Sequence, residues 1–185
     1  RVHAIFFGWL AAFSQHSDHV ATNQTNTPNI IPQHLLKRSP GSQRILPFRK
    51  YYAANQDTKI SDLFFFYFSA VRGIFFKEND KSYWDFDPER TKPTNILQTT
   101  VGYQALLKLM VDVLEKTDEL SRYKSVTYEE YLKQVINIDF EDLQRYAFTS
   151  RSANVLYYDM SLSIWPAKDD KDIRIRKLKE LLEKS

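Results

Sequence analysis

The sequence predicts a mostly α-helical protein, an irregular helical bundle around two apolar central helices with room for a minor strand. Two long stretches, 60–76 and 94–116, repeat apolar residues at the period of an α-helix. Apolar residues make up 43% of the 185 residues and aromatic residues 15%, which is enough for a real core. Shorter amphipathic segments nearer the C-terminus carry residues that suit helix starts.

The first expected element is an amphipathic helix within residues 1–13. Its apolar residues fall on one helical stripe: Val2, Ile5, Phe6, Trp9, Leu10 and Phe13. A signal sequence is the alternative for this run, but the small-residue pattern expected at a cleavage site is poor. A polar loop over 14–33 follows, and Pro32 suits the first position of a short helix.

The stretch 60–76 is expected to be the first central helix. Its apolar residues cover nearly the whole circumference, which is typical of a helix inside a core. Thr58 and Ser61 are both suited to cap its start. The run is too short and too closely flanked by charges to span a membrane.

The stretch 94–116 is expected to contain the second central helix, packed against the first. Its stripe consists of Val101, Ala105, Leu106, Leu109, Met110, Val113 and Leu114. Thr99 or Thr100 is suited to cap its start. Glycine costs helix stability, so we expect Gly102 to mark a close approach of another backbone, in a neighbouring helix. The alternative is a phosphate at the helix N-terminus.

Three further segments carry helix-start signals. Thr127 and Glu130 form a capping box, and Asp139 suits the start of a short turn. Ser152 is expected to cap a helix that ends at Trp165, because a proline follows it. The residues expected to face inward are Tyr128, Tyr131, Leu132, Val135, Ile136, Phe140, Leu143, Val155, Leu156 and Met160.

We expect a single helical domain over residues 1–167, followed by an amphipathic C-terminal helix over residues 168–185. The apolar side of this last helix consists of Ile175, Leu178, Leu181 and Leu182. Acidic residues at its start and basic residues further on suit the helix dipole. Docking on the domain is favoured over pairing with another chain or contact with phosphates.

Charge is distributed unevenly along the chain, which has a net charge of +3. Residues 1–60 carry +5, residues 61–167 carry −4 and residues 168–185 carry +2. Basic ends around an acidic middle permit contact with nucleic acid. The candidate phosphate-binding residues are Arg44, Arg49, Lys50, Arg174, Arg176, Lys177 and Lys179.

The first three candidates lie in one short stretch with three aromatic residues, Phe48, Tyr51 and Tyr52. Basic side chains beside aromatic ones hold phosphate while bases stack on the rings. The alternative is a loop that fixes the aromatic side chains in the core and leaves its charges in water.

Residues for catalysis or metal binding are sparse. The absence of cysteine excludes disulfides, thiolate metal sites and cysteine nucleophiles, and suits a cytoplasmic protein. His16 and His19 would need a third ligand to hold a metal, so we expect no metal or cofactor. The carboxylates of 129–142 fall at expected helix starts, where acids stabilise the dipole. With no P-loop, dinucleotide fingerprint or nucleophile elbow, we expect no catalytic residues.

Several motifs resemble the C-terminal half of DGQHR-domain proteins. These motifs are YFSAVRGIFF, then Trp84, then NILQTTVGYQALLKLMVDVL, in which Leu97, Thr100 and Gly102 match a Leu-x-x-Thr-x-Gly helix start. SRSANVLYYDM and NQTNTPNIIPQHLL resemble a closing turn and helix and an Asn/Gln-rich segment of that family, so the resemblance covers about residues 20–165. The signature Asp-Gly-Gln-His-Arg string is absent, and none of its residues carries over.

This family comprises ParB-related bacterial proteins, including repressor-like regulators of DNA phosphorothioation gene clusters. The resemblance implies a non-catalytic helical module of a DNA-associated bacterial regulator or defence-linked protein, with DNA as a partner. The alternative is a helical protein-interaction or oligomerisation domain without a nucleic-acid role. Its partner would be another protein chain or a missing N-terminal segment. An enzyme fragment whose active site needs that segment ranks third, and no membrane partner is expected.

Overall fold

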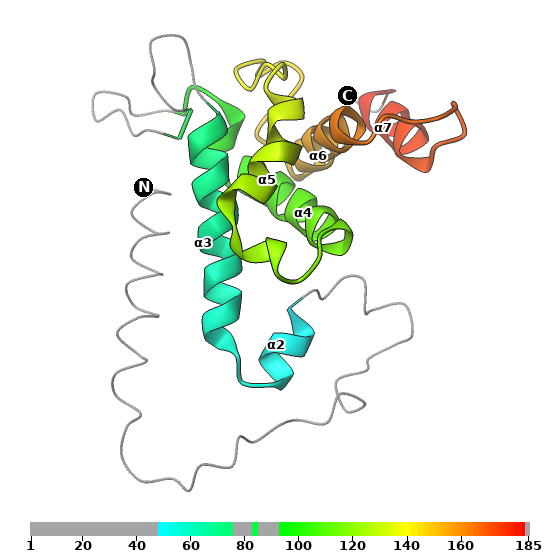
Figure 1. Ribbon diagram of the computed structural model, residues 1–185. Helices are drawn as coiled ribbons and strands as arrows, with labels where there is room; N and C mark the ends of the chain where they lie inside the picture. The colour runs from blue at the N-terminus through cyan, green and yellow to red at the C-terminus, as the bar shows by residue number, and fades with distance from the viewer. Residues whose placement is uncertain (1–47, 76–82, 85–92, 184–185) are drawn as a thin grey trace, which may run out of the picture. The chain divides into compact units, whose positions relative to one another are not determined.

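The computed structural model describes residues 48–75, 83–84 and 93–183 (Figure 1). Contacts group the chain into two compact units, Arg1–Phe65 (unit 1) and Phe66–Ser185 (unit 2). The helices are α2 (Arg49–Ala53), α3 (Asp57–Ile74), α4 (Thr100–Lys116), α5 (Ser125–Leu132), α6 (Ser150–Ile164) and α7 (Ile173–Glu183), with 3-10 turns η3 (Ile96–Gln98), η4 (Ser121–Tyr123) and η5 (Lys133–Val135). These residues contain no strand, and the expected mostly helical fold is confirmed. The helices expected over 1–13 and after Pro32 lie outside the described residues.

The described part of unit 1 consists of α2 and the first half of α3, which are joined by a tight turn. Asn55 adopts a left-handed conformation at φ 53°, which asparagine tolerates better than most residues. The amide of Gln56 donates to the Tyr51 carbonyl at 2.8 Å, and that of Asn55 to the Tyr52 carbonyl at 3.1 Å. This is a Schellman motif, which ends α2 and reverses the chain.

The start of α3 differs from the expected one. The amide of Lys59 already donates to the Gln56 carbonyl at 3.1 Å, so the first turn forms upstream of Ile60. Thr58 and Ser61 therefore lie inside the helix, and the expectation that one of them caps it was wrong. Asp57 in the first turn suits the positive end of the helix dipole.

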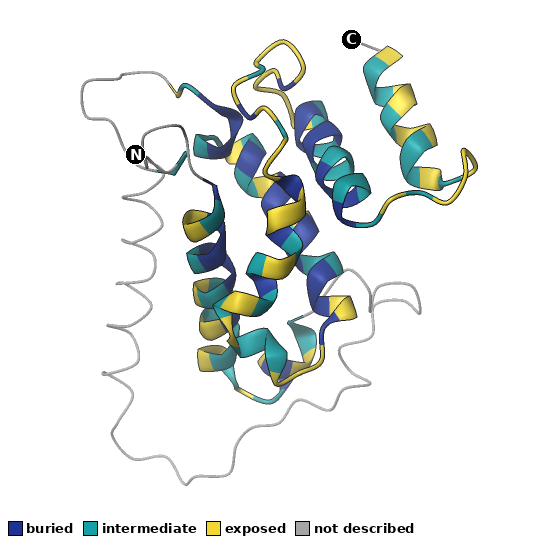
Figure 2. Cartoon of the chain, turned by 45° about the horizontal axis from the view of Figure 1, so that its top comes forward, coloured by how far each residue is buried: buried dark blue, intermediate teal, exposed yellow. Residues whose placement is uncertain are grey.

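In unit 2, the second half of α3 packs against α4, as the sequence predicts. The Tyr67 hydroxyl donates to the Leu106 carbonyl at 2.8 Å, and the Phe68 ring stacks on Tyr103 with centroids 5.3 Å apart. Complete burial raises the pKa of Tyr67 well above its ordinary value, so this hydroxyl keeps its proton. Every stripe residue of α4 except Val101 is buried (Figure 2).

The start of α4 confirms the predicted cap. The Thr99 side chain accepts a hydrogen bond from the Gly102 amide at 3.2 Å and donates one to the Ile96 carbonyl at 2.6 Å. A Cβ added at Gly102 would lie 2.2 Å from the Ile96 carbonyl oxygen and 2.7 Å from the Leu97 Cα. The close backbone is therefore that of η3, and the expected neighbouring helix was the wrong partner.

Residues 136–149, here called the irregular segment, connect η5 to α6 without a helix. Phe140 anchors the segment, because its carbonyl accepts from the Ile96 amide at 2.9 Å. Its ring packs edge-on against Phe75 and Tyr83, with centroids 5.0 and 5.6 Å apart. Tyr146 is the second buried anchor. Ile136 and Leu143, expected to face inward, are instead 55% and 37% exposed.

Two helices have their N-cap three residues before the expected one. Helix α5 begins at Ser125, and the Thr127 amide already donates to the Lys124 carbonyl at 3.2 Å. Thr127 is therefore inside the first turn, and the capping-box interpretation was wrong. Helix α6 is capped by Thr149, whose hydroxyl accepts from the amide of Ser152 at 3.3 Å. Ser152 was the wrong cap, although Val155, Leu156 and Met160 are buried as expected.

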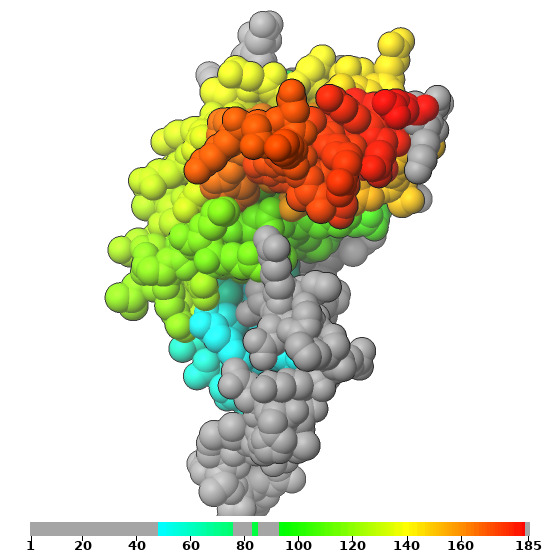
Figure 3. Space-filling view, turned by 90° about the vertical axis from the view of Figure 1, so that its right-hand side faces the viewer, coloured from blue at the N-terminus to red at the C-terminus, as the bar shows by residue number. Residues whose placement is uncertain are grey.

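Helix α7 docks on α6, which confirms the favoured prediction for the C-terminal helix (Figure 3). Arg174 donates to the carbonyl and the hydroxyl of Ser161 at 3.1 and 3.2 Å. No residue of α7 is buried, so its apolar side is only partly covered within the described part of the chain. The expected division after residue 167 stays a prediction. None of the described helices is long and apolar enough to cross a membrane.

Candidate functional site

The candidates of the N-terminal half lie in unit 1, where Arg49 and Lys50 form the first turn of α2. Lys50 is exposed, with its Nζ 4.7 Å from the centre of the Tyr51 ring. Arg49 is half-buried, and its Nη1 is buried without a hydrogen bond from the described residues. Arg44 lies outside the described residues.

The two tyrosines beside these bases have different environments. Tyr51 is 2% exposed, as the core-anchor interpretation predicts, whereas Tyr52 is 59% exposed. The Phe48 ring lies 5.2 Å from that of Phe64. Among the described aromatic residues of this stretch, Tyr52 is the most exposed and the best placed for a base to stack on its ring.

The other four candidates lie on α7 in unit 2, and Arg174 differs from the rest. Its guanidinium binds both carboxylate oxygens of Asp172, with Nη2 2.6 Å from Oδ2 and Nε 3.1 Å from Oδ1. This pair raises the pKa of Arg174 and lowers that of Asp172. Because the same guanidinium also donates to Ser161, Arg174 is committed to the docking of α7.

Arg176, Lys177 and Lys179 are exposed on the outer side of α7. Glu180 and Glu183 are also exposed on this helix, and Arg176 Nε lies 4.0 Å from Glu180 Oε1. Exposed pairs of this kind contribute little stability. The outer side of α7 thus mixes three basic with two acidic residues.

The structure places the candidate bases in two different units and does not assign them to one surface. His16 and His19 lie outside the described residues, and so does the expected loop that holds them. Among the residues that the structure describes, no group of three or more histidine or acidic side chains is placed to hold a metal ion.

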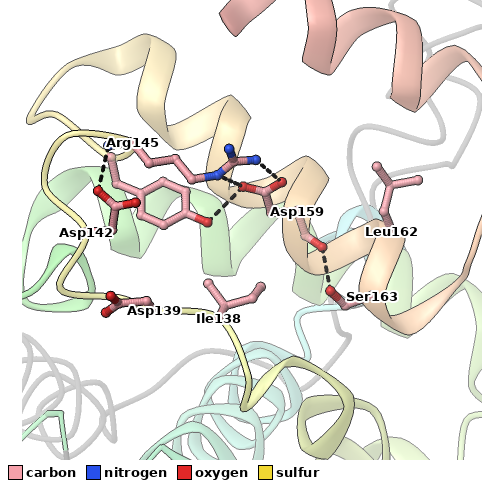
Figure 4. Close-up of a pocket in the computed structure, with 8 residues that line it drawn as sticks. Ile138, Asp139, Asp142, Arg145, Asp159, Leu162 and Ser163 are labelled. Carbon is pink, nitrogen blue, oxygen red and sulfur yellow. Dashed lines mark hydrogen bonds and ion pairs between the residues drawn. The ribbon is translucent and has the colours of Figure 1, made fainter.

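An open pocket of about 460 Å³ lies between the irregular segment and α6 in unit 2 (Figure 4). Its lining residues are Ile138, Asp139, Asp142, Arg145, Tyr146, Asp159, Leu162 and Ser163. Asp159 organises one side, because its carboxylate accepts from Arg145 Nε, Arg145 Nη2 and the Tyr146 hydroxyl, each at 2.8 Å. The Ser163 hydroxyl donates to the backbone carbonyl of Asp159 at 2.9 Å.

The electrostatics of this cluster favour a fixed structure over proton exchange. Hydrogen bonding to Asp159 raises the pKa of Arg145 above its ordinary value. Burial, and secondarily the Asp159 charge, raises the pKa of Tyr146. Both groups therefore keep their protons at neutral pH, and neither is suited to accept a proton as a general base.

The pocket also contains two of the carboxylates expected at helix starts. Asp139 Oδ1 accepts from the Glu141 amide at 2.9 Å. Asp142 Oδ1 accepts from the amides of Gln144 and Arg145 at 3.1 and 2.9 Å. They stabilise turns of the irregular segment, and neither begins a helix.

Sequence reasoning did not find this pocket. Its two sides, 138–146 and 159–163, come from different elements, and only the fold brings them together. The available local signal was Asp159, an acidic residue inside the apolar and aromatic run of the helix predicted after Ser152.

No family model, curated protein sequence or solved structure matches this chain.

Proposed function

We propose that this chain is a non-catalytic helical module of a DNA-associated bacterial regulator or defence-linked protein, in the cytoplasm. We further propose that unit 1 supplies the contact with nucleic acid. The resemblance to DGQHR-domain proteins supports the first statement, and the absence of cysteine is compatible with the location.

The observation that carries the proposal is the coincidence of a change in charge with the boundary between the units. Residues 1–65 hold seven Lys/Arg and three Asp/Glu, a net charge of +4. Residues 66–185 hold nineteen and twenty, a net charge of −1. A basic unit joined to a nearly neutral one suits a protein that holds phosphates with one part only.

The described residues of unit 1 supply both kinds of contact that single strands use. Lys50 is an exposed basic residue whose Nζ lies over the Tyr51 ring, and Tyr52 offers an exposed ring two residues away. The outer side of α7 supports such a role less well, because Glu180 and Glu183 offset its bases.

A salt titration of binding to duplex and single-stranded oligonucleotides tests this proposal. On duplex DNA we expect log affinity to fall with log salt by about 0.9 per phosphate contact, because each contact releases counterions. Arg49→Ala with Lys50→Ala should weaken binding about equally for all sequences and flatten the slope by up to ~2 units. Tyr52→Ala should weaken binding to single strands more than to duplexes.

The matched control is Lys177→Ala with Lys179→Ala, which removes the same charge from α7. We expect a smaller change in slope from this pair than from the α2 pair. If both pairs changed the slope equally, the affinity would depend on the net charge of the chain, and unit 1 would have no special role in binding. The absence of measurable binding at low salt, where the electrostatic attraction is strongest, would remove the nucleic-acid proposal.

The second candidate is a protein-interaction or oligomerisation domain without a nucleic-acid role. Its support is a set of large apolar side chains exposed in unit 2, from Leu120 at 80% to Val126 at 54% and Phe148 at 52%. Sedimentation equilibrium of the full chain, with and without oligonucleotide, separates the candidates. Self-association that does not respond to nucleic acid favours this one.

A further inference from the structure

The pocket beside Asp159 has a lining that the function proposed above does not use. Its two sides are held firmly, because Phe140 and Tyr146 anchor the irregular segment and Arg145 joins that segment to α6. A pre-formed site loses little conformational entropy when a ligand binds.

Aliphatic surface lies on both sides of the pocket. Ile138 from the irregular segment and Leu162 from α6 line it, and both are half-buried (Figure 4). A ligand that covers this surface would gain apolar burial that the chain alone does not provide.

Charge in the pocket is unbalanced. Arg145 pairs with Asp159, which leaves the charges of Asp139 and Asp142 uncompensated among the lining residues. Each of these two carboxylates uses Oδ1 for backbone amides, and the second oxygen of each accepts no hydrogen bond from the described residues. Two free carboxylate oxygens beside aliphatic side chains complement a basic group on a flexible apolar stem.

We propose that this pocket docks a segment of a partner protein in which a lysine or arginine stands next to an aliphatic residue. The basic head group binds Asp139 and Asp142, and the aliphatic side chain covers Ile138 and Leu162. This interaction is independent of the nucleic-acid contact assigned to unit 1.

The test uses the full chain and three short peptides in a glycine–serine background. One peptide carries arginine next to leucine, a second has glutamine for the arginine, and a third has serine for the leucine. Binding is followed by NMR shifts of the backbone amides. We expect the first peptide to shift amides of 138–146 and 159–163, and either replacement to weaken binding severalfold.

The informative variant is Asp139→Asn with Asp142→Asn. Asparagine keeps an oxygen for the backbone amides, so the turns survive while two charges disappear. Affinity for the first peptide should fall by about tenfold or more. Leu162→Ser, at a half-buried position of the lining, should weaken binding while both carboxylates remain.

Asp118→Asn with Asp169→Asn is the matched control. Both residues accept backbone amides in turns of the same kind, and neither lines the pocket. Equal loss of affinity in the two double variants would overturn the proposal, because binding would then follow net charge alone. Shifts elsewhere, or none, would also overturn it. So would the same shifts from magnesium or calcium alone, which would make the pocket a cation site.

Discussion

Two residues at the start of α4 have opposite effects on the local backbone. Thr99 holds the first turn by its side chain, whereas Gly102 permits η3 to pass because it has no side chain. The sequence predicted Thr99 or Thr100 as the cap, and it predicted a close backbone at Gly102 but placed that backbone in a neighbouring helix and not in η3. The same reasoning failed at Thr127 and Ser152. Thr149 caps α6 three residues before Ser152, whereas α5 follows Lys124 and has no side-chain cap.

Gly102→Ala should lower the free energy of unfolding by about 1–3 kcal/mol, because the new Cβ would meet the η3 backbone and force it to move. Gly73→Ala is the matched control, since a Cβ there meets nothing within 4 Å. It should raise the free energy of unfolding by up to about 1 kcal/mol through helix propensity. Urea denaturation measures both. An equal gain from both substitutions would show that η3 moves away at little cost.

Among the elements, α4 and α7 show that a helical period predicts a helix but does not predict how deeply that helix is buried. Both stripes predicted a helix, and both helices form. The stripe of α4 is wide and becomes core, whereas the four predicted stripe residues of α7 remain half-buried. Within the irregular segment, the sequence predicted a turn at Asp139 and an inward-facing Phe140, and both are confirmed. The rest of the segment was not predicted, because its structure depends on partners that are remote in the sequence, such as Ile96 and Phe75.

Helix α7 should open locally more easily than α6, because none of its residues is buried. Arg174→Gln should speed amide exchange in α7 by about tenfold, since it removes the charged hydrogen bonds to Asp172 and Ser161. Hydrogen exchange measured by mass spectrometry tests this. Arg176→Gln, on the outer side, should change little. Equal protection of α6 and α7 in the unmodified chain would contradict the expectation.

For the whole molecule, the sequence predicted the mostly helical fold class but did not predict that the chain forms two compact units. The charge pattern suggested basic ends around an acidic middle, and the structure places the two ends in different units. Arg174, a candidate from charge alone, proves to be paired with Asp172 and to dock α7 through Ser161 of α6. The pocket could not be predicted, because its two sides come from elements that only the fold brings together. Its charge could not be predicted either, because that charge depends on which aspartates are paired.

The anchoring of Phe140 has a consequence for the order of folding. Its partners Ile96 and Phe75 lie 44 and 65 positions earlier in the chain. The loop-closure entropy of such remote contacts must be overcome before they add stability, so they belong to the late steps of folding. Phe140→Leu should therefore speed unfolding and leave the folding rate nearly unchanged, with a φ-value near zero in stopped-flow kinetics. A φ-value near one would place this residue in the folding nucleus instead.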